Sequence, residues 1–355
     1  NIMLTMKRIL FSILVLCFPL LLIAETAPVM SIQAEVSPAE CTPVYQRKLH
    51  VKQTFHYDTL PTTNEVVFDM KPSSLIAQGL WNKNLRYAAK AYAELLGVNR
   101  QTITDVLSDF MFSVSVDQHK SKYKIRKNGT GIRLIVPLPR NKKAADITIE
   151  YDYYSDYFMP WRSLSQQQRR AFSPFLDYWE VWYFSANNMQ WGRVIVDFPD
   201  DSAYFFANHP YTTQGNEYTI SVNTDIADGL CMYIVEKALY NHTDVKVENA
   251  QIGLYLQKLF DVSDDCEITN VRDRDYRKYM PRLQQWISLL EQFTADSMPR
   301  QFDIIDGSIA MFEGMGYGTA VRNDRQYIVF ADSGFWNMPG MVHEITHCYL
   351  DYACD

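Results

Sequence analysis

Alternating apolar and polar positions recur through the middle of the chain and predict short β-strands. The clearest alternation covers residues 132–136 and 147–151, and similar patterns occur at 111–116, 193–198 and 217–222. Side chains of a strand point to opposite faces in turn, so one face of each strand can be buried while the other meets water. Several such strands, joined by turn signals, are typical of a β-sandwich or a saddle-shaped sheet.

Apolar residues three and four positions apart predict helices elsewhere. Residues 80–96 form one such stretch, which Gly97 ends, and residues 276–293 form the strongest periodic signal in the chain. The aromatic-rich segment 163–184 interrupts the predicted strands, and we expect it to be helical. Basic residues at 122–127 are expected on a solvated strand edge.

The last part of the sequence predicts one strand followed by one helix. Residues 327–331 are an apolar strand, and a loop follows them. Asn337 is suited to cap a helix, with Pro339 in its first turn. We expect this helix to run from about residue 338 to residue 355.

The order of these elements predicts an α+β protein with a β-rich N-terminal domain followed by a helical region. The predicted limits are 1–34 for a leader, 35–266 for the β-rich domain and 267–355 for the N-terminal part of a second domain. The final helical pattern stops without a cap or polar tail, so we expect the second domain to be incomplete in this chain.

The first residues resemble a secretory leader. Lys7 and Arg8 precede an apolar run over residues 9–24, which Pro19 interrupts. Cleavage after Ala24 or after Ala34 is compatible with this pattern, and an uncleaved N-terminal anchor is the alternative. No second apolar run is long enough to span a membrane, so we expect a mature chain without a membrane span, secreted or periplasmic.

Composition excludes some functions. The chain has 34 Lys and Arg against 41 Asp and Glu, a formal net charge of −7, whereas a general nucleic-acid binder needs a basic face. Hydrophobic residues at 47% and charged residues at 21% indicate a globular chain. An aromatic cluster at residues 178–184 can stack on sugars or peptides, but the same composition is more typical of a core.

The chemistry is concentrated in the predicted last helix, where the sequence reads His-Glu-Ile-Thr-His. His343 and His347 are four residues apart and therefore lie on one face of a helix, where both can bind one zinc ion. Glu344 follows the first histidine and can act as general base toward a water that the metal activates. The expected reaction is hydrolysis of a peptide bond.

A catalytic zinc site needs a third protein ligand. Asp351 is one helical turn beyond His347, about 6 Å further along the axis, which is too far from a site centred between the two histidines. Asp355 is further still. Cys348 points away from the face of His347 and is expected to pack. We therefore expect the third ligand to lie beyond residue 355.

These features resemble the gluzincin metallopeptidases, in particular the aminopeptidase-N-like and thermolysin-like group. The resemblance rests on the motif at 343–347 and on the order of helix, glycine-containing loop and strand before it, and it covers about residues 110–355. It implies a thermolysin-like zinc domain, with His343 and His347 as zinc ligands and Glu344 as general base. It also implies a third ligand, a glutamate, on a following helix.

The sequence departs from that family in one segment. The aminopeptidases carry a G-x-M-E-N segment whose glutamate binds the substrate's free amine, and residues 311–316 of this chain do not match it. Glu313 is the residue here that can bind an amine; a surface carboxylate is the alternative.

The sequence leads to one principal function and two alternatives. The principal one is a zinc metallopeptidase acting on a peptide or protein substrate, with no nucleic-acid partner. The alternatives are an extracytoplasmic β-rich binding module with a degenerate zinc helix, and a metal hydrolase with a non-peptide substrate.

Overall fold

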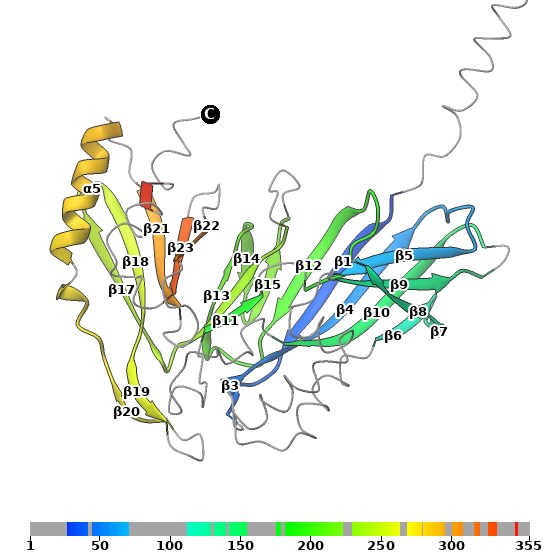
Figure 1. Cartoon of the computed structure of the whole chain (residues 1–355), viewed down its shortest axis with the longest axis horizontal. Coiled ribbons are helices and arrows are strands. Elements are labelled where there is room, and N and C mark those ends of the chain that lie inside the picture. The colour runs from blue at the N-terminus through cyan, green and yellow to red at the C-terminus, as the bar shows by residue number, and fades with distance from the viewer. Residues whose placement is uncertain are drawn as a thin grey trace, which may run out of the picture.

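The computed structural model shows a chain built mainly of β-sheets (Figure 1). The part of the chain that the structure describes comprises residues 27–41, 45–70, 112–128, 131–139, 142–154, 175–178, 182–222, 229–262, 268–278, 280–294, 300–307, 316–319, 326–331 and 345–346.

The largest sheet has eight strands in the order β14-β15-β12-β1-β4-β10-β6-β7. Its central strand β1 (Val29–Val36) pairs in parallel with β12 (Gln190–Asp197) and antiparallel with β4 (Lys48–Tyr57). The other strands are β10 (Ala145–Tyr154), β6 (Ser113–Val116), β7 (His119–Lys120), β14 (Tyr211–Gln214) and β15 (Glu217–Ile220). Alternate residues of β1 and β4 are buried, which places one face of the sheet against a core.

Two three-stranded sheets contribute to the same core. One has the order β5-β9-β8, with β5 (Glu65–Met70), β9 (Gly131–Pro137) and β8 (Lys124–Asn128). The other has the order β11-β16-β13, with β11 (Phe175–Tyr178), β16 (Met232–Glu236) and β13 (Ala203–Ala207). We call the hydrophobic cluster among these sheets the first core; Phe55, Phe68 and Ile149 are fully buried in it.

A five-stranded mixed sheet lies at the other end of the molecule, in the order β17-β18-β21-β23-β22 (Figure 1). Its strands are β17 (Tyr240–Val247), β18 (Ala250–Gln257), β21 (Arg300–Gly307), β23 (Gln326–Ala331) and β22 (Gly316–Thr319). The central strands β18, β21 and β23 run parallel to one another. Parallel strands need a crossover, and α5 (Met280–Thr294) lies between β18 and β21 in the sequence.

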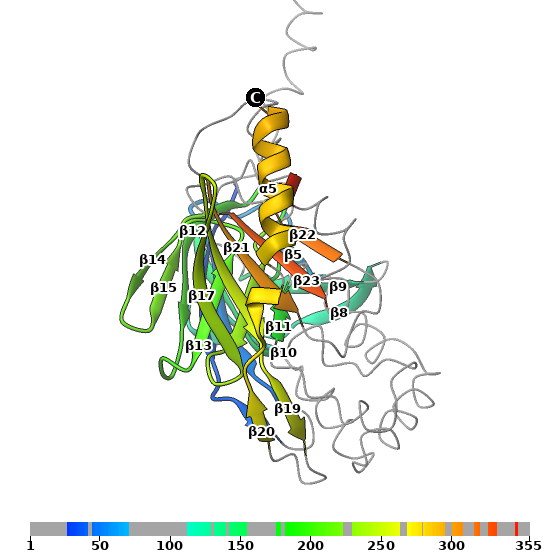
Figure 2. The ribbon, with the colours of Figure 1, turned by 90° about the vertical axis from the view of Figure 1, so that its left-hand side faces the viewer.

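Helix α5 packs on one face of the mixed sheet (Figure 2). A 3₁₀ turn, η2 (Tyr276–Lys278), precedes it. Leu283, Trp286 and Ile287 are the buried residues of the helix. They meet sheet residues such as Phe302 and Ile304 in a hydrophobic cluster that we call the second core.

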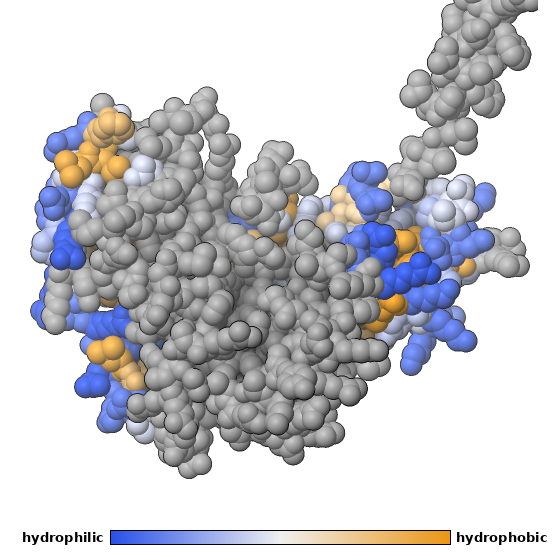
Figure 3. Space-filling model, in the orientation of Figure 1, coloured by the Kyte–Doolittle hydropathy of each residue, from blue (hydrophilic) through white to orange (hydrophobic). Residues whose placement is uncertain are grey.

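Two hairpins complete the described structure. They are β2 (Glu40–Cys41) with β3 (Tyr45–Gln46), and β19 (Leu259–Val262) with β20 (Ile268–Arg272). Exposed apolar side chains include Leu289 and Phe293 of α5 and Leu259 and Val271 of the second hairpin. In Figure 3, orange atoms occur on the side of the molecule where Figure 1 shows α5 and this hairpin. Within the described residues, no helix is both long and apolar enough to traverse a lipid bilayer.

The structure confirms the β-rich character and most of the predicted strands. The alternating segments form β6, β9, β10, β12 and β15, and the strongest helical pattern forms η2 and α5. Residues 124–127 of the basic stretch lie in β8, an edge strand as predicted. In the aromatic cluster, Trp182, Tyr183 and Phe184 are buried core residues.

One element prediction is wrong, and others lie outside the described residues. Phe175–Tyr178 is a strand, β11, and not part of a helix, because it pairs antiparallel with β16. In the same predicted helix, residues 182–184 are not helical either, while residues 163–174 and 179–181 lie outside the described residues. The predicted helix at 80–96 and residues 1–26 of the predicted leader also lie outside them.

The predicted domain limits stay a prediction. Two observations concern the limits at residue 34 and at residue 266. Strand β1 covers residues 29–36, so cleavage after Ala24 leaves this central strand whole, whereas cleavage after Ala34 removes most of it. The second core includes residues of β17 and β18, which precede the predicted limit at residue 266.

Candidate functional site

Of the five residues of the predicted zinc motif, the structure describes Ile345 and Thr346. Ile345 and Thr346 are α-helical, in agreement with the helix that the sequence predicts there. The predicted ligands His343 and His347, the general base Glu344 and the amine-binding candidate Glu313 lie outside the described residues. Their mutual geometry therefore stays a prediction.

Ile345 anchors the motif to the second core. Its side chain is fully buried in the cluster that contains Leu283, Trp286 and Ile287 of α5 and Phe302 of β21. Ile345 therefore packs on the face of the mixed sheet that also carries α5. Its burial turns the side of the helical turn at Ile345 toward the second core.

A buried polar cluster holds the carboxyl end of β21. Asp306, which is fully buried, accepts a hydrogen bond from Arg274 Nη1 at 3.0 Å and one from the backbone N–H of Gln257 at 3.3 Å. The phenol of Tyr240 donates to the backbone carbonyl of Asp306 at 2.7 Å. These contacts tie β17, β18 and β21 to the segment that leads into α5.

Burial governs the electrostatics of this cluster. It raises the pKa of Tyr240 well above its ordinary value, and the negative charge of Asp306 acts in the same direction, so the phenol stays protonated as a donor. The guanidinium of Arg274 offsets the charge of Asp306, since an unpaired buried carboxylate is costly.

The Asp306 cluster was missed at the sequence level. Its members come from four separate segments, and no spacing within the sequence marks them as partners. One feature of the sequence could have pointed to the cluster, namely an acidic residue at the end of an otherwise apolar strand. This feature alone is too common to identify a buried cluster. The cluster fixes the strand end that leads toward the segment containing Glu313.

Among the described residues, no group of three or more His, Cys, Asp or Glu side chains is placed to hold a metal ion. The fit of a metal to this chain therefore depends on the donor types in the motif itself. Two imidazoles four residues apart, with a carboxylate between them, are donors that suit zinc.

Comparison with known proteins gives matches among solved structures only. No protein-family model and no curated protein sequence matches the chain. The structural neighbours include zinc metallopeptidases of the M1, or aminopeptidase N, family and LTA4 hydrolase, all at low sequence identity.

Three of these structures illustrate the similarity. An aminopeptidase N family protein from Idiomarina loihiensis is 10% identical, with 90% of this chain and 47% of that chain covered and a TM-score of 0.48. Yeast LTA4 hydrolase in complex with bestatin is 10% identical, with 91% and 43% covered and a TM-score of 0.45. The M1 zinc metallopeptidase from Deinococcus radiodurans is 10% identical, with 91% and 64% covered and a TM-score of 0.36. The chain thus spans between 43% and 64% of the length of these structures.

Proposed function

We propose that this chain carries part of a zinc-dependent metallopeptidase. The observation that carries the proposal is the sequence His-Glu-Ile-Thr-His, whose central residue Ile345 is helical and fully buried in the second core. A hydrolase of this type cleaves peptide bonds with a metal-activated water.

The position of Ile345 supports the proposed ligand pair. An α-helix turns by about 100° per residue, so residues two positions before and after Ile345 are each turned by about 200° from it. On a regular helix, His343 and His347 then share the face opposite the buried isoleucine. That orientation leaves both imidazoles away from the core, on one side of the helix.

The proposed roles follow from this arrangement. His343 and His347 would hold the zinc. A zinc ion there would supply Lewis-acid chemistry and an activated water. Glu344 would be the general base, which takes up a proton and passes it to the leaving amine.

Other parts of the proposal rest on the sequence alone. We propose a third zinc ligand outside this chain, a peptide or protein as the substrate, and a secreted or periplasmic location. Glu313 is the proposed contact to the substrate's amine.

The test is to measure zinc content and peptide hydrolysis in the complete protein. Glu344→Gln should keep the zinc and lower kcat by at least about a hundredfold, because it removes the general base and keeps the ligands. His343→Ala should lose most of the bound zinc. His119→Ala, which changes an exposed histidine on β7, is the matched control and should alter neither property. Full hydrolysis by Glu344→Gln would contradict the assignment of the base.

A further inference from the structure

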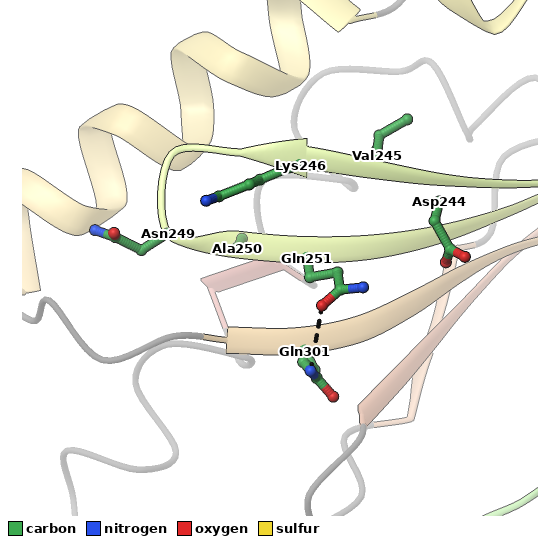
Figure 4. Close-up of a pocket in the computed structure, with 7 residues that line it drawn as sticks. All are labelled: Asp244, Val245, Lys246, Asn249, Ala250, Gln251 and Gln301. Atoms are coloured by element: carbon green, nitrogen blue, oxygen red, sulfur yellow. Dashed lines mark hydrogen bonds between the residues drawn. The ribbon is translucent and has the colours of Figure 1, made fainter.

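A polar groove lies at the hairpin end of the mixed sheet, where β17 turns into β18. Figure 4 shows its lining, a cavity of about 480 Å³. We define the polar groove by the side chains of Asp244, Lys246, Asn249, Gln251 and Gln301.

The groove lies on the sheet face opposite α5. Ile252 and Phe302, which neighbour Gln251 and Gln301 in the sequence, are buried in the second core on the α5 side. Because neighbouring residues of a strand point to opposite faces, Gln251 and Gln301 point away from α5. Lys246 is the cross-strand partner of Gln251, so all three lie in one row across β17, β18 and β21.

The groove presents hydrogen-bonding groups that the protein leaves available. Gln301 Nε2 donates to Gln251 Oε1 at 3.3 Å. Within the described residues, Gln251 Nε2, Gln301 Oε1 and the Lys246 ammonium make no hydrogen bond or ion pair. One acid, Asp244, and one base, Lys246, balance the charge of the groove, which favours a neutral ligand.

A second cavity, of about 300 Å³, is related to the groove by the register of the strands. Gly253 lies between Asp244 and Asp303 in the next row of the sheet, and Asp303 lines that second cavity. The two cavities therefore lie on the same face of the mixed sheet. Along β18 on this face, Gln251 is exposed, Gly253 is buried and Tyr255 is 8% exposed.

The second cavity is walled by tyrosines. Its lining includes Tyr204, Tyr211, Tyr218 and Tyr255, together with Lys237. The rings of Tyr204 and Tyr255 meet edge to face, 4.9 Å apart, and Lys237 Nζ lies 5.2 Å from the centre of the Tyr204 ring. Tyrosine combines a flat apolar surface with a polar group.

We propose that the polar groove and the second, tyrosine-lined cavity together bind a neutral oligosaccharide. Amide and carboxylate side chains suit the hydroxyl groups of a sugar, and tyrosine rings suit its apolar faces. A polypeptide is less suited, because β18 and β21, which carry Gln251 and Gln301, already pair with a strand on each side and cannot pair with an added strand. The cavity volumes are in the range of small-ligand sites.

The test is saturation-transfer NMR and calorimetric titration of the whole chain with cellotriose, maltotriose and di-N-acetylchitobiose. At least one should bind with a Kd of about 1 mM or tighter. Gln251→Ala with Gln301→Ala should weaken that binding about tenfold, because both remove hydrogen bonds to the ligand. Gln284→Ala, an exposed glutamine on α5 on the other face, is the matched control and should bind normally. Thermal melting of each variant verifies folding.

Three results would overturn the proposal: no binding of any of the three sugars, binding that the double substitution leaves unchanged, or equally tight binding of trialanine that depends on Gln251. None of these readouts requires zinc or hydrolysis. A failure here therefore leaves the proposed peptidase function untouched, and a failure of that function leaves this proposal untouched.

Discussion

At the scale of single residues, Gln53 shows how a polar side chain can be part of a hydrophobic core. It is fully buried on β4. Its amide nitrogen donates to the backbone carbonyl of Phe184, and its amide oxygen accepts the backbone N–H of Phe184 at 2.9 Å. The side chain thus pairs with a backbone segment as a neighbouring strand would. Tyr151 completes the network by donating to the carbonyl of Trp182 at 2.9 Å.

We predict that Gln53→Leu destabilises the protein by about 2–4 kcal/mol. The substitution keeps the volume but leaves the buried N–H and C=O of Phe184 without partners, and each unmade hydrogen bond of this kind costs about 1–3 kcal/mol. Chemical denaturation measures the effect. Gln285→Leu, on the exposed side of α5, should change the free energy of unfolding by less than about 0.5 kcal/mol. Equal effects of the two substitutions would contradict the proposed pairing.

At the scale of elements, the sequence predicts strands well where one face is exposed. Strands β4 and β10 alternate, whereas β16 is buried at every residue and has no alternation to detect. The same absence of alternation explains why residues 175–178, which pair with β16, were predicted as helix: a short, aromatic-rich run does not distinguish the two periods. Helix α5 is predicted because apolar residues recur three and four positions apart over residues 276–293, and its buried residues Leu283, Trp286 and Ile287 belong to this pattern.

Asp69 of β5 gives an element-scale prediction about pH. It accepts two hydrogen bonds from Arg133 of β9, both at 2.8 Å, and one from Asn128 of β8 at 3.0 Å. The Arg133 guanidinium lowers the pKa of Asp69 below its ordinary value of 3.8, although partial burial acts the other way. The ionised carboxylate therefore joins all three strands of this small sheet.

A lowered pKa means that the folded state favours the ionised form, so the stabilisation is present above pH 4 and is lost as the pH falls through the folded-state pKa. Asp69→Asn should therefore lower stability at pH 7, by about 1 kcal/mol or less because the pair is partly exposed. The difference from the unaltered protein should shrink below pH 4. Urea denaturation at several pH values measures this difference, and a difference that stays the same from pH 7 to pH 3 would contradict the role of the ionised carboxylate.

At the scale of the whole molecule, local sequence and tertiary structure contribute different parts of each site. The zinc motif is visible in five consecutive residues because a helix places positions four apart on one face. The Asp306 cluster and the polar groove are not visible in this way. Their members, such as Asp244 and Gln301, are brought together by the order β17-β18-β21, which includes a parallel crossover that sequence periodicity does not specify.

The division into two cores leads to a prediction that connects fold and site. Ile345 belongs to the second core and Ile149 to the first, and both are fully buried. Replacing either by alanine should cost about 2–5 kcal/mol through lost burial and a cavity. Only Ile345→Ala should also lower zinc affinity, by at least about tenfold, because it removes the contact that orients the helix carrying His343 and His347. Competition with a zinc chelator measures affinity, and equal losses in both variants would show that the motif depends on overall stability rather than on this contact.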